Sequence, residues 1–170
     1  MGFTWKILFY VGVFSLLHFG YELTGWAALI PFFGVDESVF EHLKMGFFSY
    51  FLTSTFEYFL IKKKNKGGNF WFSRILSNIS IPWLILTIWY ILPAIFGKIE
   101  SVAIELIWAF FVVFLSAFFG ITFEKTVEQA KPRMTAQITV LIVFLVCVFF
   151  FVRFSFSKPW IDVFIDPHTI

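Results

Sequence analysis

The chain has 170 residues, of which 59% are hydrophobic and only 14% charged, and its mean hydropathy is +0.86. A soluble domain of 19.9 kDa has too much surface to hide so much apolar material, so the composition excludes an ordinary soluble protein. The net charge of +2, without a basic patch, excludes nucleic acid as a partner, and the single Cys147 excludes an intrachain disulfide.

Several apolar runs are long enough to cross a hydrocarbon core about 30 Å thick, which needs roughly 20 residues. Helices are the expected form, because the backbone in lipid must satisfy its own hydrogen bonds. The sequence therefore predicts an all-α integral membrane protein, a single domain over 1–170 embedded in the lipid bilayer. The five predicted spans are about 5–26, 38–61, 70–96, 101–123 and 134–154.

The first span begins like a signal peptide, but His18 and Glu22 interrupt its apolar core and no cleavage site follows, which predicts a retained helix. The link 27–35 is expected at the membrane interface or folded back into it. A basic turn follows the second span, at 62–69. Pro82 is expected to kink the third span, and a short charged connector, 124–133, is expected between the fourth and fifth spans.

Positive residues set the expected orientation, because Lys and Arg concentrate on the inner side of a membrane. With the N-terminus inside and the C-terminus outside, nine of the 13 Lys and Arg lie on the inner side. Eight of the 11 acids and every histidine then fall in the outer half. These residues are Glu22, Asp36, Glu37, Glu41, Glu100, Glu105, Asp162, Asp166, His18, His42 and His168.

His18 and Glu22 are spaced i, i+4 on the first helix and so share one face. An ionisable group at this depth needs a partner or a wet cavity. One interpretation is a metal-ligating or proton-handling pair. The alternative is a hydrogen bond that pins two helices together.

Residues 36–44 form a dense polar run, Asp-Glu-Ser-Val-Phe-Glu-His-Leu-Lys, at the start of the second span. Ser38 and Glu41 match a capping box, which accounts for part of the run as a helix start. Glu37 and Glu41 share one face of the expected helix with Lys44 and are further candidates for acid or base chemistry. His42 points to another face and begins a small and polar stripe that continues through Gly46, Ser49, Thr53 and Glu57. Close helix packing is the alternative explanation for the small members of that stripe.

Glu57 and Arg74 lie at similar depth on consecutive spans, so an intramembrane ion pair is expected. A proton relay at the inner end of the stripe is the functional alternative. Glu105, one turn below the outer boundary of the fourth span, would support the outer cluster or simply favour a helix N-terminus.

The stretches His-Phe-Gly-Tyr-Glu-Leu at 18–23, the polar run at 35–44, Phe-Glu-Tyr-Phe at 56–59 and Pro-Trp-Ile-Asp-Val-Phe-Ile-Asp-Pro at 159–167 carry a family resemblance. The chain resembles small, uncharacterised bacterial membrane proteins, frequent in Firmicutes, with an Asn-Glu-Ser-x-x-Glu-His-x-Lys motif. Asp36 stands where that pattern has Asn. The resemblance implies a multi-pass protein of a bacterial cell membrane and carries no activity.

Three functions compete. The first is an outer site for a divalent metal such as zinc, or for a proton, with catalysis on a lipid-like substrate. His18, Glu22 and His42 would be the ligands, because two His and one carboxylate form a known catalytic zinc set. The second is a small homo-oligomeric transporter of protons, cations or small solutes along the stripe to Glu57. The third is a non-catalytic membrane subunit in which the polar cluster serves assembly.

Overall fold

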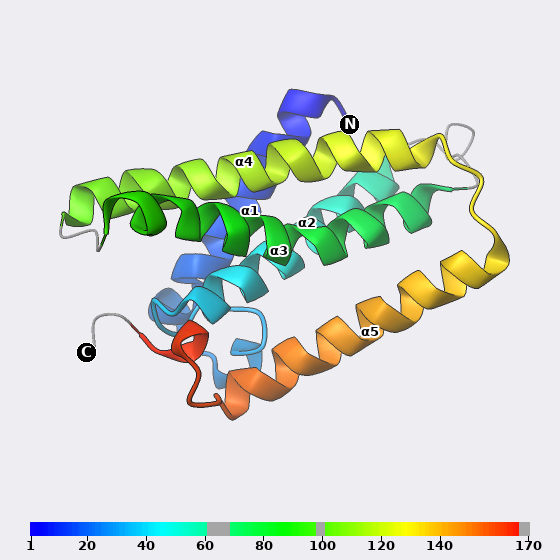
Figure 1. Cartoon of the computed structure of the whole chain (residues 1–170). Helices are drawn as coiled ribbons and strands as arrows, with labels where there is room; N and C mark the ends of the chain where they lie inside the picture. Colours follow the sequence, from blue (N-terminus) through cyan, green and yellow to red (C-terminus); the bar gives the residue numbers. More distant parts are fainter. Residues whose placement is uncertain (61–68, 98–100, 167–170) are drawn as a thin grey trace.

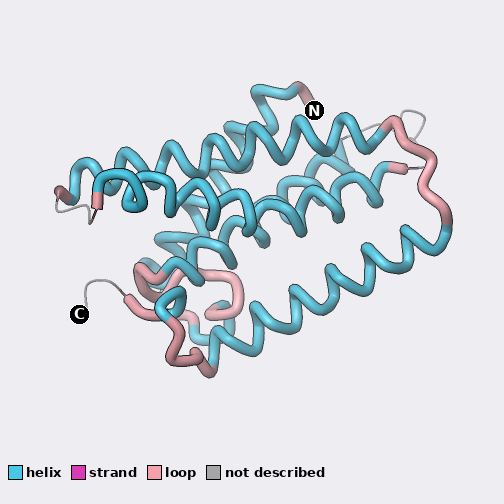
Figure 2. The backbone as a smooth tube through the Cα atoms, viewed as in Figure 1, coloured by secondary structure: helices cyan, strands magenta, loops and turns pink. Residues whose placement is uncertain are grey.

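A computed structural model describes residues 1–60, 69–97 and 101–166, which fold into an all-helical bundle. The helices are α1 (Phe3–Thr24), α2 (Val39–Leu60), α3 (Phe70–Phe96), α4 (Val102–Glu128) and α5 (Met134–Phe156), with short 3₁₀ turns η1 (Ala27–Leu29) and η3 (Asp162–Phe164). Within the described ranges there is no strand (Figure 2). The basic turn 62–69 falls almost wholly outside them, as do Glu100 and His168.

Four helices, α1, α3, α4 and α5, are long and apolar enough to cross a membrane. The fifth, α2, is as long as α1, with 22 residues, but carries three charged side chains, Glu41, Lys44 and Glu57. The protein is thus a multi-pass helical membrane protein by length and composition.

The most polar helix occupies the middle of the bundle. More than half of the α2 residues are buried, whereas α5 buries only Phe144. Charged and hydroxyl groups in a membrane helix face the bundle interior, where protein partners are available, and apolar side chains can face lipid at no cost. α5 accordingly runs along one edge of the bundle (Figure 1) and meets α2 through phenylalanine rings, including Phe47 against Phe144 at 5.3 Å.

Two glycines allow α3 to approach its neighbours closely. A Cβ at Gly46 of α2 would collide with Ile85, and one at Gly120 of α4 would lie 2.5 Å from Ile81. Small residues at such crossings permit the tight packing that holds membrane helices together. The result is a fully buried apolar layer that contains Met45, Ile81, Ile85, Val113 and Ala117.

The link between α1 and α2 folds back against α1. Gly25 ends α1 in the left-handed conformation at φ 62°, and its N–H bonds to the Tyr21 carbonyl. Further on, the Gly34 N–H donates to the Leu17 carbonyl at 3.1 Å. This return brings residues 35–38 beside the end of α1.

The fourth helix is longer than the span predicted for it. α4 continues past 123 to Glu128, so Glu124 lies within the helix rather than in a connector. Its side chain is buried, 1% exposed, because partners from three other helices surround it.

Candidate functional site

Three predicted site residues meet where α1 ends and α2 begins. The Nε2 atoms of His18 and His42 lie 3.7 and 3.6 Å from the two carboxylate oxygens of Glu37. One potential ligand atom from each residue lies within 4.8 Å of the others. Both imidazoles are largely buried, whereas the Glu37 side chain is 46% exposed. The group is therefore open to solvent on the carboxylate side.

Backbone and aromatic contacts orient the His42 ring. Its Nδ1 lies 3.0 Å from the Ser38 carbonyl oxygen, which can only accept, so Nδ1 carries the proton and Nε2 keeps its lone pair. Trp89 stacks on the ring with centroids 6.1 Å apart. A histidine held in this way presents Nε2 as metal ligands do.

The His18 ring is held by aromatic neighbours. Phe14 stacks on it at 6.5 Å and Phe19 meets it edge-on at 4.8 Å. Within the described part of the chain, its Nδ1 is buried without a hydrogen-bond partner. Packing rather than a polar contact therefore fixes this ring.

The loop that carries Glu37 is anchored on both sides. Asp36 accepts a hydrogen bond from the Ser38 N–H at 2.9 Å and binds the Lys158 ammonium. Burial favours a higher pKa for Asp36, but the hydrogen bonds from Lys158 and Ser38 outweigh it and hold the pKa below its usual value. Asp36 is thus charged at neutral pH and ties the loop to the C-terminal segment.

Two hollows of different character meet at His18. An apolar cavity of about 70 Å³ lies between α1 and α4 and is lined by Phe14, His18, His42, Leu106 and Phe110, among others. A cleft of about 370 Å³ on the other side is lined by His18, Tyr21, Glu22, Asp36 and Glu37, among others. The His–Glu group therefore lies at the boundary between the apolar cavity and the polar cleft.

Other predicted site residues lie elsewhere. Glu22 lines the polar cleft, but Glu37 takes its place in the three-residue group. Glu41 is fully buried and forms ion pairs with Lys44 at 2.6 Å and with Lys158 at 3.0 Å. Glu105, in the first turn of α4, is not part of the group. Glu37 precedes the start of α2, so the helical-face argument that paired it with Glu41 does not apply.

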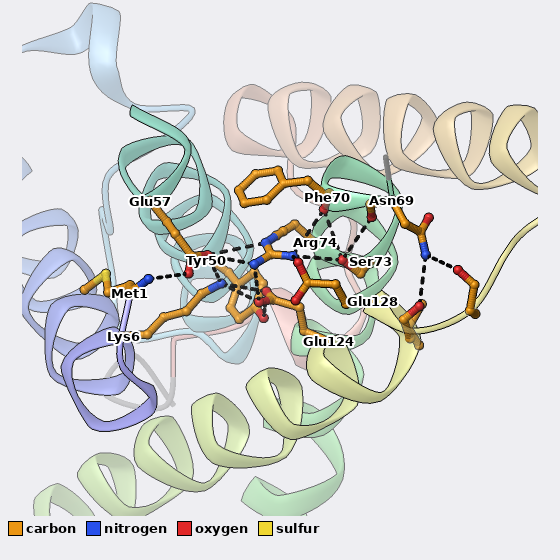
Figure 3. A network of polar contacts seen from close by, with 12 residues as sticks. Met1, Lys6, Tyr50, Glu57, Asn69, Phe70, Ser73, Arg74, Glu124 and Glu128 are labelled. Carbon is orange, nitrogen blue, oxygen red and sulfur yellow. Dashed lines mark hydrogen bonds and ion pairs between the residues drawn. The ribbon is translucent and has the colours of Figure 1, made fainter. Parts of the chain in front are cut away.

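A second polar cluster occupies the opposite end of the bundle, called here the inner end after the expected orientation (Figure 3). Lys6 lies between two carboxylates, 2.5 Å from Glu57 and 2.7 Å from Glu124. Arg74 lies 3.3 Å from both, so the Glu57–Arg74 ion pair expected from the sequence is present. The further members are Tyr50, which donates to Glu124 at 2.6 Å, Glu128, which binds Arg74 at 2.6 Å, and the Met1 amino group, 3.2 Å from Glu57.

Sequence reasoning missed the roles of Lys6, Tyr50 and Glu124. From the sequence alone, Lys6 is one of the inner-side Lys and Arg residues that set the expected orientation, and Glu124 belongs to the connector expected after the fourth span. A signal for Glu124 was present, since Ser116, Gly120 and Glu124 recur every four residues and so share a helix face. No local pattern indicated that Lys6 would meet that face.

The polar stripe of α2 faces the interior, as its small residues allow. Ser49 and Thr53 are both fully buried. Neither hydroxyl has a hydrogen-bond partner among the described residues.

In the described part of the chain, helices with an apolar exterior, a buried cluster of charged residues at one end and a His–Glu group at the other define a multi-pass helical membrane protein with an internal polar site. The chain belongs to a family of unknown function, DUF6512, whose pattern it matches over residues 3–169. Comparison with curated proteins and with solved structures finds no match.

Proposed function

We propose that the protein binds a divalent transition metal through His18, Glu37 and His42 at the outer end of a five-span bundle, with its N-terminus inside. The observation that carries the proposal is the convergence of both Nε2 atoms on one carboxylate, at 3.6 and 3.7 Å. Two ligands on one tetrahedral zinc ion stand about 3.4 Å apart, given bonds of about 2.0–2.1 Å. The pair distances suit a shared ion better than direct hydrogen bonds.

The donor set supports zinc in particular. Imidazole nitrogen and carboxylate oxygen are zinc ligands, and three protein ligands leave the fourth position for water. The His42 bond to the Ser38 carbonyl supplies the outer contact that metal-bound histidines usually have.

The two hollows support a catalytic use of this site. Water reaches the group from the polar cleft, and an apolar substrate reaches it from the cavity between α1 and α4. A bound metal would lower the pKa of its water and polarise a carbonyl. Glu22, which lines the same cleft, would serve as the group that accepts or donates the proton. The chemistry that fits is hydrolysis of an ester or amide bond in a lipid-like substrate.

The transport alternative receives less support. The stripe from His42 to Glu57 is interrupted by the apolar layer of Met45, Ile81 and Ile85, all at most 2% exposed. Such a layer is a barrier to ions. Assembly as a non-catalytic subunit stays open as an outcome of the test below.

The test is metal content, measured by elemental mass spectrometry on detergent-purified protein. Wild type should hold close to one zinc or other transition metal per chain, and His18→Ala, His42→Ala and Glu37→Gln should each lose most of it. Glu105→Gln is the matched control and should retain it. Glu22→Gln should also retain the metal while losing hydrolysis of a lipid ester.

Folded wild type without metal, after incubation with zinc, would overturn the proposal. Lower stability in the histidine variants, with no metal in any of them, would indicate an assembly role instead.

A further inference from the structure

A band of polar side chains crosses the middle of the bundle between α2 and α3. The two helices are antiparallel, and their register is set by the Glu57–Arg74 pair and by the stacking of His42 on Trp89. Moving forward along α2 by a given number of residues and backward along α3 by the same number therefore leads from one facing pair to another. The two pairs above are related in this way.

That register places Thr53 and Ser54 of α2 opposite Asn78 and Ser77 of α3. All four lie one helical turn from Glu57 and Arg74. Ser49 extends the band one turn outward on α2. We call these five residues the polar layer.

Every side chain of the polar layer is buried, and most of their polar atoms are unpaired. The five residues are at most 1% exposed. In the described ranges, the hydroxyl oxygens of Ser49, Thr53 and Ser54 and the two Asn78 amide atoms have no hydrogen-bond partner, while the Ser77 hydroxyl lies beside the Tyr50 hydroxyl. Buried polar groups almost always have a partner, in the protein or in ordered water, because an unpaired one costs free energy.

Hydroxyl groups elsewhere in these helices behave differently. Ser15, Thr55 and Ser80 each donate to the carbonyl four residues earlier on the same helix. The polar-layer hydroxyls do not, although the same bond is open to any helical Ser or Thr.

Pro82 adds an acceptor to the same region. It has no N–H to offer the Asn78 carbonyl four residues earlier. Pro93 likewise has no N–H for the Trp89 carbonyl, and this carbonyl accepts a hydrogen bond from the Trp108 indole N–H at 3.1 Å instead. Membrane helices tolerate such prolines because side chains or waters satisfy the freed carbonyl.

We propose that the polar layer binds internal water that enters from the inner end of the bundle. Water fits because the hydroxyls and the Asn78 amide need a ligand that both donates and accepts hydrogen bonds. A neutral ligand fits because the nearest charges, Lys6, Arg74, Glu57 and Glu124, are already paired with each other.

A polar cavity of about 190 Å³ at the inner end supplies the entrance. Lys6, Glu57, Arg74 and Glu124 contribute to its lining, and the polar layer begins one turn beyond them. On the other side the apolar layer of Met45, Ile81, Ile85, Val113 and Ala117 closes the path. The water therefore reaches the middle of the membrane from one side and stops there. This inference does not depend on a metal at the outer end.

Cysteine accessibility tests the proposal, because a thiol reacts as the thiolate, which forms only in contact with water. In a Cys147→Ala background, Thr53→Cys is compared with Ala117→Cys, which is equally buried but lies in the apolar layer. Detergent-solubilised protein is treated with a small charged methanethiosulfonate, and the adduct is followed by intact mass. Thr53→Cys should react at least tenfold faster. Equal or slower reaction in a folded variant would overturn the proposal.

An isosteric variant gives a second readout. Thr53→Val removes the hydroxyl and keeps the shape. If the hydroxyl binds water, the midpoint of thermal unfolding should fall by about 2–6 °C. A rise in the midpoint would mean that the hydroxyl is dry and unpaired, and would overturn the proposal.

Discussion

Lys6 places one positive charge between two buried carboxylates. Its side chain is 2% exposed, and its ammonium group lies 2.5 Å from Glu57 and 2.7 Å from Glu124. Taking these charges out of water is costly, and only close mutual pairing offsets the cost. The residue therefore ties α1 to α2 and α4 at the inner end of the bundle.

Replacing Lys6 by Met should be strongly destabilising, because it leaves two carboxylates buried beside each other with only Arg74 and the Met1 amino group to balance them. We expect a loss of about 3–5 kcal/mol in the free energy of unfolding, measured in detergent. Lys125→Met, an exposed lysine of α4, is the control and should cost less than about 1 kcal/mol. Adding Glu124→Gln to Lys6→Met should restore part of the loss. Equal effects of the two lysine variants would contradict this account.

At the scale of elements, the C-terminal segment is fastened to the start of α2. Phe164 of η3 stacks on Phe40 with ring centroids 4.6 Å apart. Lys158 binds Asp36 and Glu41. We call these contacts of Phe164 and Lys158 with the start of α2 the clamp. Since Asp36 directly precedes Glu37, the clamp also holds the loop that carries the proposed metal ligand.

The clamp should depend on pH through Asp36. The pKa of Asp36 in the folded protein is below the ordinary value of 3.8. The stabilisation that charged Asp36 gives to the clamp is therefore complete above that pH, and it is lost as the pH falls through the lower pKa of the folded protein. Hydrogen exchange of residues 157–166, corrected for the intrinsic rate, should be steady from pH 7 to about 4 and then accelerate.

Lys158→Met should remove this pH dependence and accelerate exchange of the segment roughly 5–30-fold at neutral pH. Arg153→Met, exposed near the end of α5, should leave the exchange unchanged. An unaltered profile in Lys158→Met would show that the aromatic contacts alone hold the segment.

At the scale of the molecule, the described helices α1 to α5 alternate in direction and place the two polar clusters at opposite ends. The inner cluster joins the start of α1 to the ends of α2 and α4, and the His–Glu group joins the end of α1 to the start of α2. If every helix crosses the membrane, the two clusters face different compartments.

The proposed orientation predicts labelling from one side only. In a Cys147→Ala background, Ser157→Cys after α5 should react with an impermeant maleimide added to intact cells. Lys131→Cys, between α4 and α5, should react only after the membrane is opened. The reverse pattern would invert the orientation, and labelling of both positions from one side would exclude a spanning α5.

The sequence by itself determined the membrane class and the helices, because both follow from local apolar content and chain length. It also indicated His18, His42 and the Glu57–Arg74 pair, since an ionisable group in an apolar run stands out without any knowledge of the fold. Only the tertiary structure decided that Glu37 rather than Glu22 joins the two histidines, because the link after α1 folds back and α2 begins two residues later. It likewise decided that Lys6 and Glu124 meet. The contact joins residues that are 118 positions apart, and no local periodicity encodes such a distance.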